Sequence, residues 1–315
     1  MPRRSGSGAL VEAAAQRRET EVDAFDYVRP GSLQELVRGL GEAGAEGAVL
    51  AGGTDLHVKL RAGKMRPRVL FDVSELAPLR AIVLKDGMLR IGAAARVTEI
   101  AASPAVRGAL PALVSAVSEM SSRQIRNRAT VGGNIVTASP AADAVPPLLA
   151  ADAVVVLVGP EGGREVALAD FIVGPGKTAK RPSEVVAEVA VPVGAMSRRS
   201  QFVKIGRRKA QAISVVNLAG CVEMEADGRV RDLRIALGAV APTAMRAHRA
   251  EAALRGRKPS AGNLREAAAI AAQECRPISD IRATADGRRR LVEAWTLRML
   301  QTLTGPPSVG RGADQ

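Results

Sequence analysis

Aromatic and metal-binding side chains are scarce in this sequence. Its 315 residues include four phenylalanines, one tryptophan, one tyrosine, two cysteines and two histidines. So few aromatic rings exclude a stacking platform for single-stranded nucleic acid. The cysteines and histidines are too few for a four-cysteine iron–sulfur cluster or a spaced zinc site, so we expect no metal site. A role in electron transfer would therefore require an organic cofactor.

Long apolar runs are missing as well. No stretch approaches the ~18 consecutive apolar residues of a membrane-spanning helix. Near the start of the chain, Glu12, Arg17 and Arg18 interrupt any apolar run of signal-peptide length. We therefore predict a flexible polar extension over residues 1–22, no transmembrane segment and a cytoplasmic location.

Lysine and arginine outnumber aspartate and glutamate by 45 to 32, which gives a formal net charge of +13. Such an excess attracts nucleic acid, acidic partners or anionic cofactors. No helix-turn-helix or RNA-recognition signature accompanies it, so we predict no nucleic-acid partner. Residues 288–290 are three consecutive arginines inside an expected helix, where we predict a solvated face.

Hydrophobic periodicity, capping residues and turn pairs outline the fold. Ser32 and Glu35 form a helix-capping pattern, and Asp-Gly pairs at residues 86–87 and 227–228 indicate hairpins. The expected helices are 33–40, 97–102, 112–120, a short one ending at 148–151, 245–254, 263–275 and 286–303. The expected strands are 48–51, 69–73, 81–84, 88–91, 153–158, 164–167, 185–191, 217–226 and 229–240. This order predicts an α+β fold with two mixed lobes and a C-terminal domain of a sheet and helices.

Two segments place a glycine pair after a short apolar run. One pair is Gly52-Gly53 and the other is Gly132-Gly133, each with threonine and an asparagine or aspartate nearby. A Gly-Gly step at the end of a strand can turn successive N–H groups toward one point, where they suit a phosphate oxygen. An isolated pair would be a tight turn, but the matched settings favour two loops that hold a diphosphate between them.

Other phosphate and catalytic motifs are incomplete. Residues 174–178 read Gly-Pro-Gly-Lys-Thr, but a phosphate-binding P-loop would need glycine where Phe171 stands. The G-x-G-x-x-G fingerprint of the dinucleotide fold and the G-x-S-x-G elbow are absent. We therefore assign no catalytic residues.

Five segments in order resemble the FAD-binding medium subunit of the molybdenum hydroxylases. This family includes xanthine dehydrogenase, the aerobic carbon monoxide dehydrogenases and 4-hydroxybenzoyl-CoA reductase. Besides the two glycine segments, the resemblance is carried by residues 25–30, 174–178 and 202–214. It extends from about Phe25 to about Leu303, which is nearly the whole chain.

The resemblance implies how the chain is divided. It implies a two-lobed FAD-binding domain of the vanillyl-alcohol-oxidase/PCMH type over residues 23–195, with lobes at about 23–78 and 79–195. A C-terminal domain with an antiparallel sheet and helices is expected over residues 200–304, followed by a tail at 305–315.

The resemblance also implies the cofactor-binding residues. The two glycine segments would hold the FAD diphosphate, largely through backbone N–H groups. The expected cofactor-binding residues are Leu50, Ala51, Gly52, Gly53, Thr54, Asp55, Leu56, Met120, Thr130, Val131, Gly132, Gly133, Asn134, Asp143, Val186 and Lys204.

Alternatives remain for several of these residues. Asp143 could instead be the N-cap of a short helix, because it stands just ahead of Pro146-Pro147. Lys204 is either a cation near the flavin or an exposed strand lysine. Met120 and Val186 are either cofactor contacts or ordinary core residues.

The expected function follows from the resemblance. FAD, bound non-covalently, would take electrons from the [2Fe-2S] clusters of a small partner subunit and pass them to an external acceptor. A large partner subunit with molybdopterin would perform the hydroxylation, and the assembly would be a dimer of heterotrimers. The alternatives are a self-contained flavin oxidase or dehydrogenase and a flavin-binding assembly protein without turnover.

Overall fold

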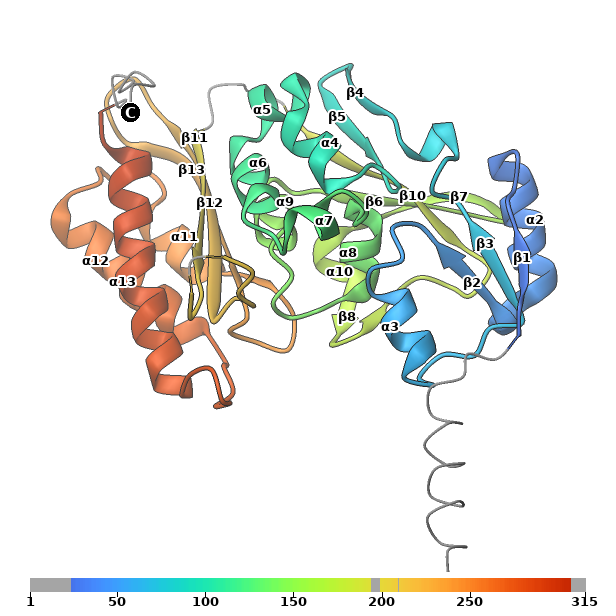
Figure 1. Cartoon of the computed structure of the whole chain (residues 1–315). Helices are drawn as coiled ribbons and strands as arrows, with labels where there is room; N and C mark the ends of the chain where they lie inside the picture. Colours follow the sequence, from blue (N-terminus) through green and yellow to red (C-terminus); the bar gives the residue numbers. More distant parts are fainter. Residues whose placement is uncertain (1–23, 194–198, 209, 307–315) are drawn as a thin grey trace, which may run out of the picture.

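The computed structural model describes residues 24–193, 199–208 and 210–306. The predicted extension at 1–22 and most of the predicted tail lie outside the described residues. Within the described part of the chain, no helix combines the length and the hydrophobicity needed to cross a bilayer. Secondary structure is α+β, with three main sheets and helices on both sides of the last one (Figure 1).

The first lobe is a three-stranded parallel sheet in the order β1-β3-β2. Its elements are β1 (Asp26–Val28), α2 (Leu33–Ala43), η1 (Gly44–Glu46), β2 (Gly47–Leu50), α3 (Leu56–Arg61), β3 (Val69–Asp72) and η2 (Ala77–Leu79). Helix α2 begins as predicted, because the Ser32 hydroxyl accepts a hydrogen bond from the Glu35 N–H at 3.1 Å. Its apolar face buries Leu36 and Leu40.

The second lobe is a five-stranded antiparallel sheet in the order β4-β5-β10-β6-β7. Its strands are β4 (Ile82–Lys85), β5 (Met88–Gly92), β6 (Val154–Gly159), β7 (Gly162–Ala167) and β10 (Val185–Pro192). The predicted hairpin turn is present, since Asp86 and Gly87 both have positive φ, 52° and 72°. In β6 every second side chain is buried, among them Val155 and Leu157, so one face of this strand contributes to the core.

Helices between residues 97 and 171 cover this sheet. They are α4 (Val97–Ala102), α5 (Pro104–Ala109), α6 (Pro111–Ser118), α7 (Arg123–Arg126), α8 (Val131–Thr137), α9 (Val145–Ala150) and α10 (Leu168–Phe171). A small hairpin of β8 (Ile172–Gly174) and β9 (Lys177–Thr178) follows them. Helices α3, α5, α7 and α8 were not predicted, because they are short and carry little periodic signal.

The second glycine pair contradicts one prediction. Gly132 and Gly133 do not end a strand but lie in the first turn of α8, with Thr130 as its N-cap. Strand-like apolar residues such as Val131 occur here in a helix, because its first N–H groups are satisfied by acceptors elsewhere in the chain. Neither glycine has positive φ.

The C-terminal part is a four-stranded antiparallel sheet, and the helices that belong to this part all cover one of its faces. Its elements are β11 (Arg199–Ile205), β12 (Val216–Met224), β13 (Val230–Gly238), β14 (Met245–Arg246), α11 (His248–Leu254), α12 (Ala261–Glu274) and α13 (Ala285–Thr304). Figure 1 shows these helices on the outer face, while α6 and α9 lie against the inner face. The helix expected from residue 245 begins at His248, because residues 245–246 pair with β13 instead.

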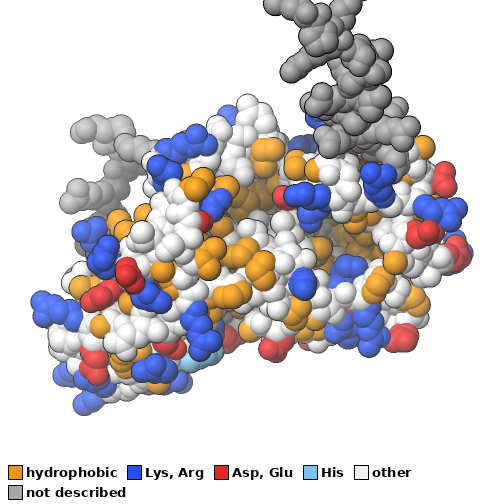
Figure 2. Space-filling model, turned by 90° about the horizontal axis from the view of Figure 1, so that it is seen from below, with side chains coloured by type: hydrophobic (Ala, Val, Ile, Leu, Met, Phe, Trp, Pro, Cys, Tyr) orange, Lys and Arg blue, Asp and Glu red, His pale blue; other side chains and the backbone are white. Residues whose placement is uncertain are grey.

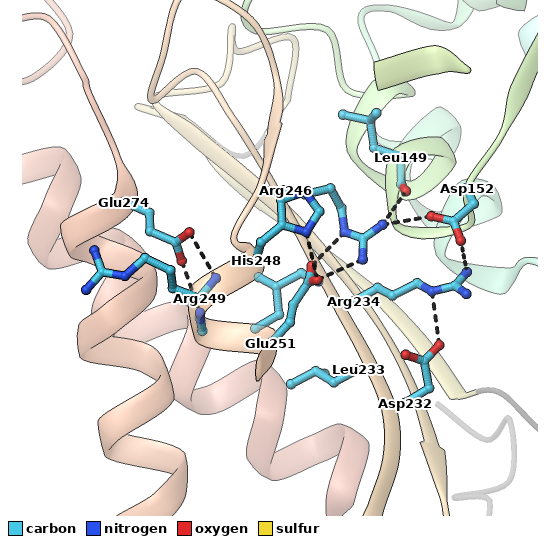
Figure 3. A network of polar contacts seen from close by, with 12 residues as sticks. Leu149, Asp152, Asp232, Leu233, Arg234, Arg246, His248, Arg249, Glu251 and Glu274 are labelled. Carbon is cyan, nitrogen blue, oxygen red and sulfur yellow. Dashed lines mark hydrogen bonds and ion pairs between the residues drawn. The ribbon is translucent and has the colours of Figure 1, made fainter. Parts of the chain in front are cut away.

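Polar contacts join the second lobe to the C-terminal sheet (Figure 3). Asp152, just after α9, pairs with Arg234 at 2.6 Å and with Arg246 at 2.8 Å. Arg246 also pairs with the buried Glu251 at 2.6 Å. Asp152 therefore links the second lobe to two strands of the C-terminal sheet.

The three-arginine run differs from its predicted solvated face. Arg288 has only 4% of its surface exposed, whereas Arg290 is exposed. Arg288 donates to the carbonyls of Val215 and Ala239 and pairs with Asp280. The helix was predicted correctly, but the prediction of a solvated face is wrong for Arg288. Consecutive helical residues point in different directions, so Arg288 is buried while Arg290 is exposed.

Candidate functional site

A cavity of about 590 Å³ lies where the two lobes meet the C-terminal sheet. This volume is within the range of ~300–1,000 Å³ that is typical of ligand sites. All of the predicted cofactor residues except Leu50 and Val131 line it. Seen from below, the surface is hollowed between the lobes, with hydrophobic side chains in the hollow and lysine and arginine side chains around it (Figure 2).

The first glycine pair forms a loop between β2 and α3. Gly53 has φ 76°, a conformation that glycine adopts without strain. Among the described residues, no acceptor bonds to the backbone N–H of Gly52, Gly53 or Thr54. Unpaired N–H groups beside a positive-φ glycine are the elements of an anion-binding nest. The assignment of a phosphate to this loop stays a prediction that these features support.

The two glycine segments are in direct contact. A Cβ added to Gly52 would lie 2.1 Å from the carbonyl oxygen of Arg128, so no larger residue fits there. The Thr137 hydroxyl donates to the Asp55 carboxylate at 3.3 Å, which links α8 to the first loop. Segments far apart in sequence thus form one wall of the cavity.

The backbone of the second glycine segment already has partners. The N–H of Val131 donates to the Ala95 carbonyl at 3.2 Å, and the N–H of Gly132 donates to the Ala93 carbonyl at 2.9 Å. The Gly133 N–H donates to the Thr130 hydroxyl at 3.1 Å. The reason given for a second backbone nest is therefore wrong, because these N–H groups have acceptors within the chain.

What this segment offers a ligand is space and one side chain. A Cβ on Gly133 would meet only the Thr130 hydroxyl, at 3.0 Å, and otherwise face open room. The Oδ1 atom of Asn134 is buried without a hydrogen-bond partner among the described residues, and Asn134 lines the cavity. A buried amide without a partner costs free energy, so it marks a position where a ligand donor would be accommodated.

Asp143 and Lys204 form an ion pair at the cavity wall. Their charged atoms are 2.6 Å apart, and their side chains are 8% and 7% exposed. Asp143 also accepts hydrogen bonds from Ser214 at 2.6 Å and from Asn217 at 2.7 Å. The pair joins the loop between α8 and α9 to strand β11 and the start of β12.

Two interpretations from the sequence are wrong, namely Asp143 as a helix N-cap and Lys204 as an exposed strand lysine. The N-cap of α9 is Ala144, not Asp143, and no side chain caps that helix. Lys204 is not an exposed strand lysine, since it is buried against Asp143 and also donates to the Glu119 carbonyl at 3.2 Å. A buried carboxylate and ammonium persist together because each satisfies the charge of the other.

Met120 and Val186 are both core residues and cavity residues. They are 6% and 4% exposed and belong to the largest hydrophobic cluster. Both also line the cavity, so the two alternatives for them are compatible.

Lys180 is a cavity residue that the sequence analysis missed. Its ammonium donates to the carbonyls of Arg181 and Glu184, each at 2.9 Å, and burial lowers the pKa of Lys180. Glu184, which also lines the cavity, pairs with Arg164 at 2.7 Å. Neither residue belongs to a recognisable motif, although they follow shortly after the family-like residues 174–178.

The hairpin at residues 174–178 does not line the cavity. It contains Gly176 at φ 69°, whose N–H donates to the Ala138 carbonyl at 3.0 Å. This contact supports the C-terminal end of α8 from outside, as a structural turn would. The structure therefore gives no support for a phosphate-binding P-loop at these residues.

Comparison with known proteins assigns the family. The model of the FAD binding domain in molybdopterin dehydrogenase matches residues 23–194, and the model of the CO dehydrogenase flavoprotein C-terminal domain matches residues 201–303. The xanthine dehydrogenase FAD-binding subunit of Escherichia coli O157:H7 is 32% identical over 280 residues, covering 88% of this chain and 95% of that protein. The carbon monoxide dehydrogenase medium chain of Hydrogenophaga pseudoflava is 32% identical over 278 residues, with 88% and 96% covered.

Solved structures agree with these relatives. A chain of carbon monoxide dehydrogenase from Hydrogenophaga pseudoflava superposes with a TM-score of 0.85 at 32% identity, covering 90% of this chain and 98% of that one. A chain of quinoline 2-oxidoreductase from Pseudomonas putida 86 gives a TM-score of 0.84 at 29% identity. The protein is therefore an FAD-binding oxidoreductase chain and belongs to the family of flavoprotein subunits of the molybdopterin dehydrogenases.

Proposed function

We propose that this chain is the electron-transferring flavoprotein subunit of a molybdenum-containing dehydrogenase complex. The observation that carries the proposal is the cavity, which is lined both by a loop with unpaired N–H groups and by a buried Asp143–Lys204 pair. Bound FAD supplies the capacity to accept electrons from a donor and pass them on singly or in pairs. The chain itself supplies binding, orientation and charge.

Each group of cavity residues has a proposed task. The N–H groups of Gly52, Gly53 and Thr54 hold a phosphate, because they line the cavity and no acceptor in the described part of the chain bonds to them. The Asn134 side chain satisfies its buried Oδ1 against a cofactor donor. Lys204 supplies positive charge at the wall, which would stabilise negative charge on the bound group.

The size of the cavity and the small residue at position 133 both suit FAD. The cavity is large enough for an extended cofactor, and Gly133 leaves open room where any side chain would intrude. We propose non-covalent binding, because neither the two histidines nor the two cysteines line the cavity. Cys221 and Cys275 are both buried, and burial raises the pKa of Cys275 to about 12, so its reactive thiolate is not formed at neutral pH.

Acid precipitation tests the non-covalent linkage. Yellow colour should stay in the supernatant after the purified flavoprotein is denatured in acid. Colour that remains with the protein pellet would contradict this expectation.

The partners are proposed from the relatives. One relative is named a carbon monoxide dehydrogenase medium chain, and another is named the FAD-binding subunit of xanthine dehydrogenase. We propose a small partner with [2Fe-2S] clusters as electron donor, a large partner with molybdopterin, and a dimer of such heterotrimers. The external acceptor takes electrons from FAD. A cytoplasmic location stays a prediction from the sequence.

Purification without a denaturing step tests the assembly. The native protein should copurify with two other subunits, and the complex should contain molybdenum, iron and flavin together. The isolated chain should bind FAD and show no hydroxylase activity. A lone homo-oligomer that oxidises an organic substrate without metals would instead establish a self-contained flavin enzyme.

A further inference from the structure

Arg288 is a buried arginine in the first turn of α13 that contacts two loops of the C-terminal sheet. Its Nη1 donates to the Val215 carbonyl at 2.9 Å and to the Ala239 carbonyl at 2.6 Å. Its Nη2 pairs with Asp280 at 2.8 Å. A buried guanidinium requires several acceptors, and here two of them are backbone atoms just before β12 and just after β13. Arg288 therefore ties these two loops to each other.

Both loops hold the segment that carries Asp143. Ser214 directly precedes Val215, and its hydroxyl donates to the Asp143 carboxylate at 2.6 Å. The Ala239 N–H donates to the Pro140 carbonyl at 2.7 Å, three residues before Asp143. Ala239 has φ 61°, which a residue with a side chain adopts only where its surroundings hold it. The hydrogen bond from the Arg288 guanidinium to the Ala239 carbonyl helps to stabilise this conformation.

We propose that Arg288 is a positioning residue for the cofactor cavity. By fixing Val215 and Ala239, it keeps Ser214 and the loop with Pro140 in place, so that Asp143 holds Lys204 at the cavity wall. A planar guanidinium can bond two carbonyls and a carboxylate at once, whereas a lysine ammonium cannot reproduce that fork. This inference rests on the proposed function, because its consequence is expressed in the binding and redox properties of FAD.

The neighbouring arginines provide a matched control. Arg289 pairs with Asp286 on its own helix, and Arg290 is exposed. Neither contacts the loops around the cavity. A substitution at Arg290 removes the same charge from the same helix without touching Val215 or Ala239.

A double-mutant cycle on the full chain tests the proposal. Arg288→Met and Ser214→Ala are made singly and together, and the FAD dissociation constant is measured by fluorescence titration. We expect each single variant to weaken FAD binding by about tenfold and the double variant to be little weaker, since both act through Asp143. Arg290→Met should bind as the wild type does.

A second readout separates positioning from general stability. The midpoint potential of bound flavin in Arg288→Met should shift in the same direction as in Lys204→Met, while Arg288→Lys should retain part of the wild-type value. If Arg288→Met does not fold, Arg288→Lys replaces it in the cycle.

The possible results separate this inference from the proposed function. Independent, additive effects of the two substitutions overturn the inference, as does a folded Arg288 variant with wild-type affinity and potential. A wild-type chain that binds no FAD overturns the proposed function together with this inference. Normal wild-type binding with additive effects overturns the inference alone.

Discussion

At the scale of single residues, the two glycine pairs share a motif but not a role for their backbone. Gly53 has positive φ and an N–H without an acceptor, whereas the Gly133 N–H already bonds to Thr130. The first pair offers donors to a phosphate, and the second offers space. The difference follows from the helix that begins at Val131, because the carbonyls of Ala93 and Ala95 and the Thr130 hydroxyl accept the N–H groups of its first turn.

Gly133→Val should abolish flavin binding while leaving the fold. The added side chain would enter the open room beside the cavity, and the glycine has no positive φ that the substitution would strain. Absorbance of purified flavin per chain, with circular dichroism for the fold, measures the effect. Gly108→Val is the control, because that helical glycine also has open space but lies outside the cavity lining. Full flavin occupancy in Gly133→Val would contradict the assignment of this segment.

Glu184 should make stability depend on acidic pH. Hydrogen bonds from Arg164 lower the pKa of Glu184 from its usual 4.5, despite the opposing effect of burial. Its stabilising contribution is therefore complete well above pH 4.5 and is lost as the pH falls through 4.5 toward the lower folded value. Glu184→Gln should lower the free energy of unfolding by about 1–3 kcal/mol at pH 7, and by less in acid.

Urea denaturation at several pH values measures this dependence. The difference between the wild type and Glu184→Gln should shrink as the pH falls below about 5. Glu161→Gln is the control, since Glu161 forms an exposed pair with Arg181. A difference between the wild type and Glu184→Gln that stays constant down to pH 3 would contradict the prediction.

At the scale of elements, short helices decide the shape of the cavity. Helix α8 spans seven residues, too few for strong stability alone, so its cap and its tertiary contacts hold it. Thr130 caps α8 by accepting from Gly133, and it is 4% exposed. The Thr130 hydroxyl therefore helps to hold Gly133 beside the cavity, together with the hydrogen bonds of Val131 and Gly132.

Thr130→Ala should destabilise the protein by about 1 kcal/mol, because an orphan N–H would remain at the start of the helix. It should also weaken flavin binding, since the first turn of α8 lines the cavity. Thermal denaturation and flavin titration measure the two effects. Thr130→Ser keeps the hydroxyl and should behave much like the wild type. Equal losses in both variants would show that the threonine methyl group, not the cap, matters.

At the scale of the whole molecule, two large apolar clusters stabilise the second lobe and the C-terminal sheet in contact with each other. One cluster belongs to the second lobe and reaches Phe202 and Cys221, and the other fills the C-terminal sheet and its helices. Asp152 adds a polar link between Arg234 and Arg246 of the C-terminal sheet. Most of the cavity lining comes from the two lobes, and the C-terminal side of this interface contributes Lys204, Ala212 and Ile213.

Asp152→Ala should loosen this link. Because Asp152 is 46% exposed, we expect a loss of only about 1 kcal/mol in unfolding free energy. The single tryptophan, Trp295, lies in α13 and reports on the C-terminal helices, while flavin release reports on the cavity. In urea, flavin release should precede the tryptophan transition in the variant more than in the wild type.

Asp227→Ala provides the control for that experiment. Asp227 forms an exposed ion pair with Arg229, two residues along the same turn, and it makes no contact across the interface. The order of the two transitions should be unchanged in this variant. An identical change in Asp152→Ala and Asp227→Ala would show that the link across the interface carries no special weight.

Local patterns predicted much of the fold because they act over a few residues. The Ser32 cap, the Asp86-Gly87 turn and the alternation in β6 each depend on neighbours within about four positions, so the sequence alone determined them. The first glycine loop belongs with them, since a strand that ends at Gly-Gly needs no distant partner. The order of five family-like segments likewise identified the flavoprotein family, which the comparisons confirm.

Tertiary structure alone decided the features that depend on distant partners. Residue 131 begins a helix rather than ending a strand, because carbonyls of Ala93 and Ala95 accept its first N–H groups. Asp143 binds Ser214 and Asn217, more than seventy residues away, and Arg288 is buried where Arg290 is not. Hydrophobic periodicity in the sequence predicts a helix or a strand, but it does not predict which distant loop that element will contact. These distant contacts decide which charges are buried, and here they place Lys204 and Asp143 at the wall of the cavity that we propose for FAD.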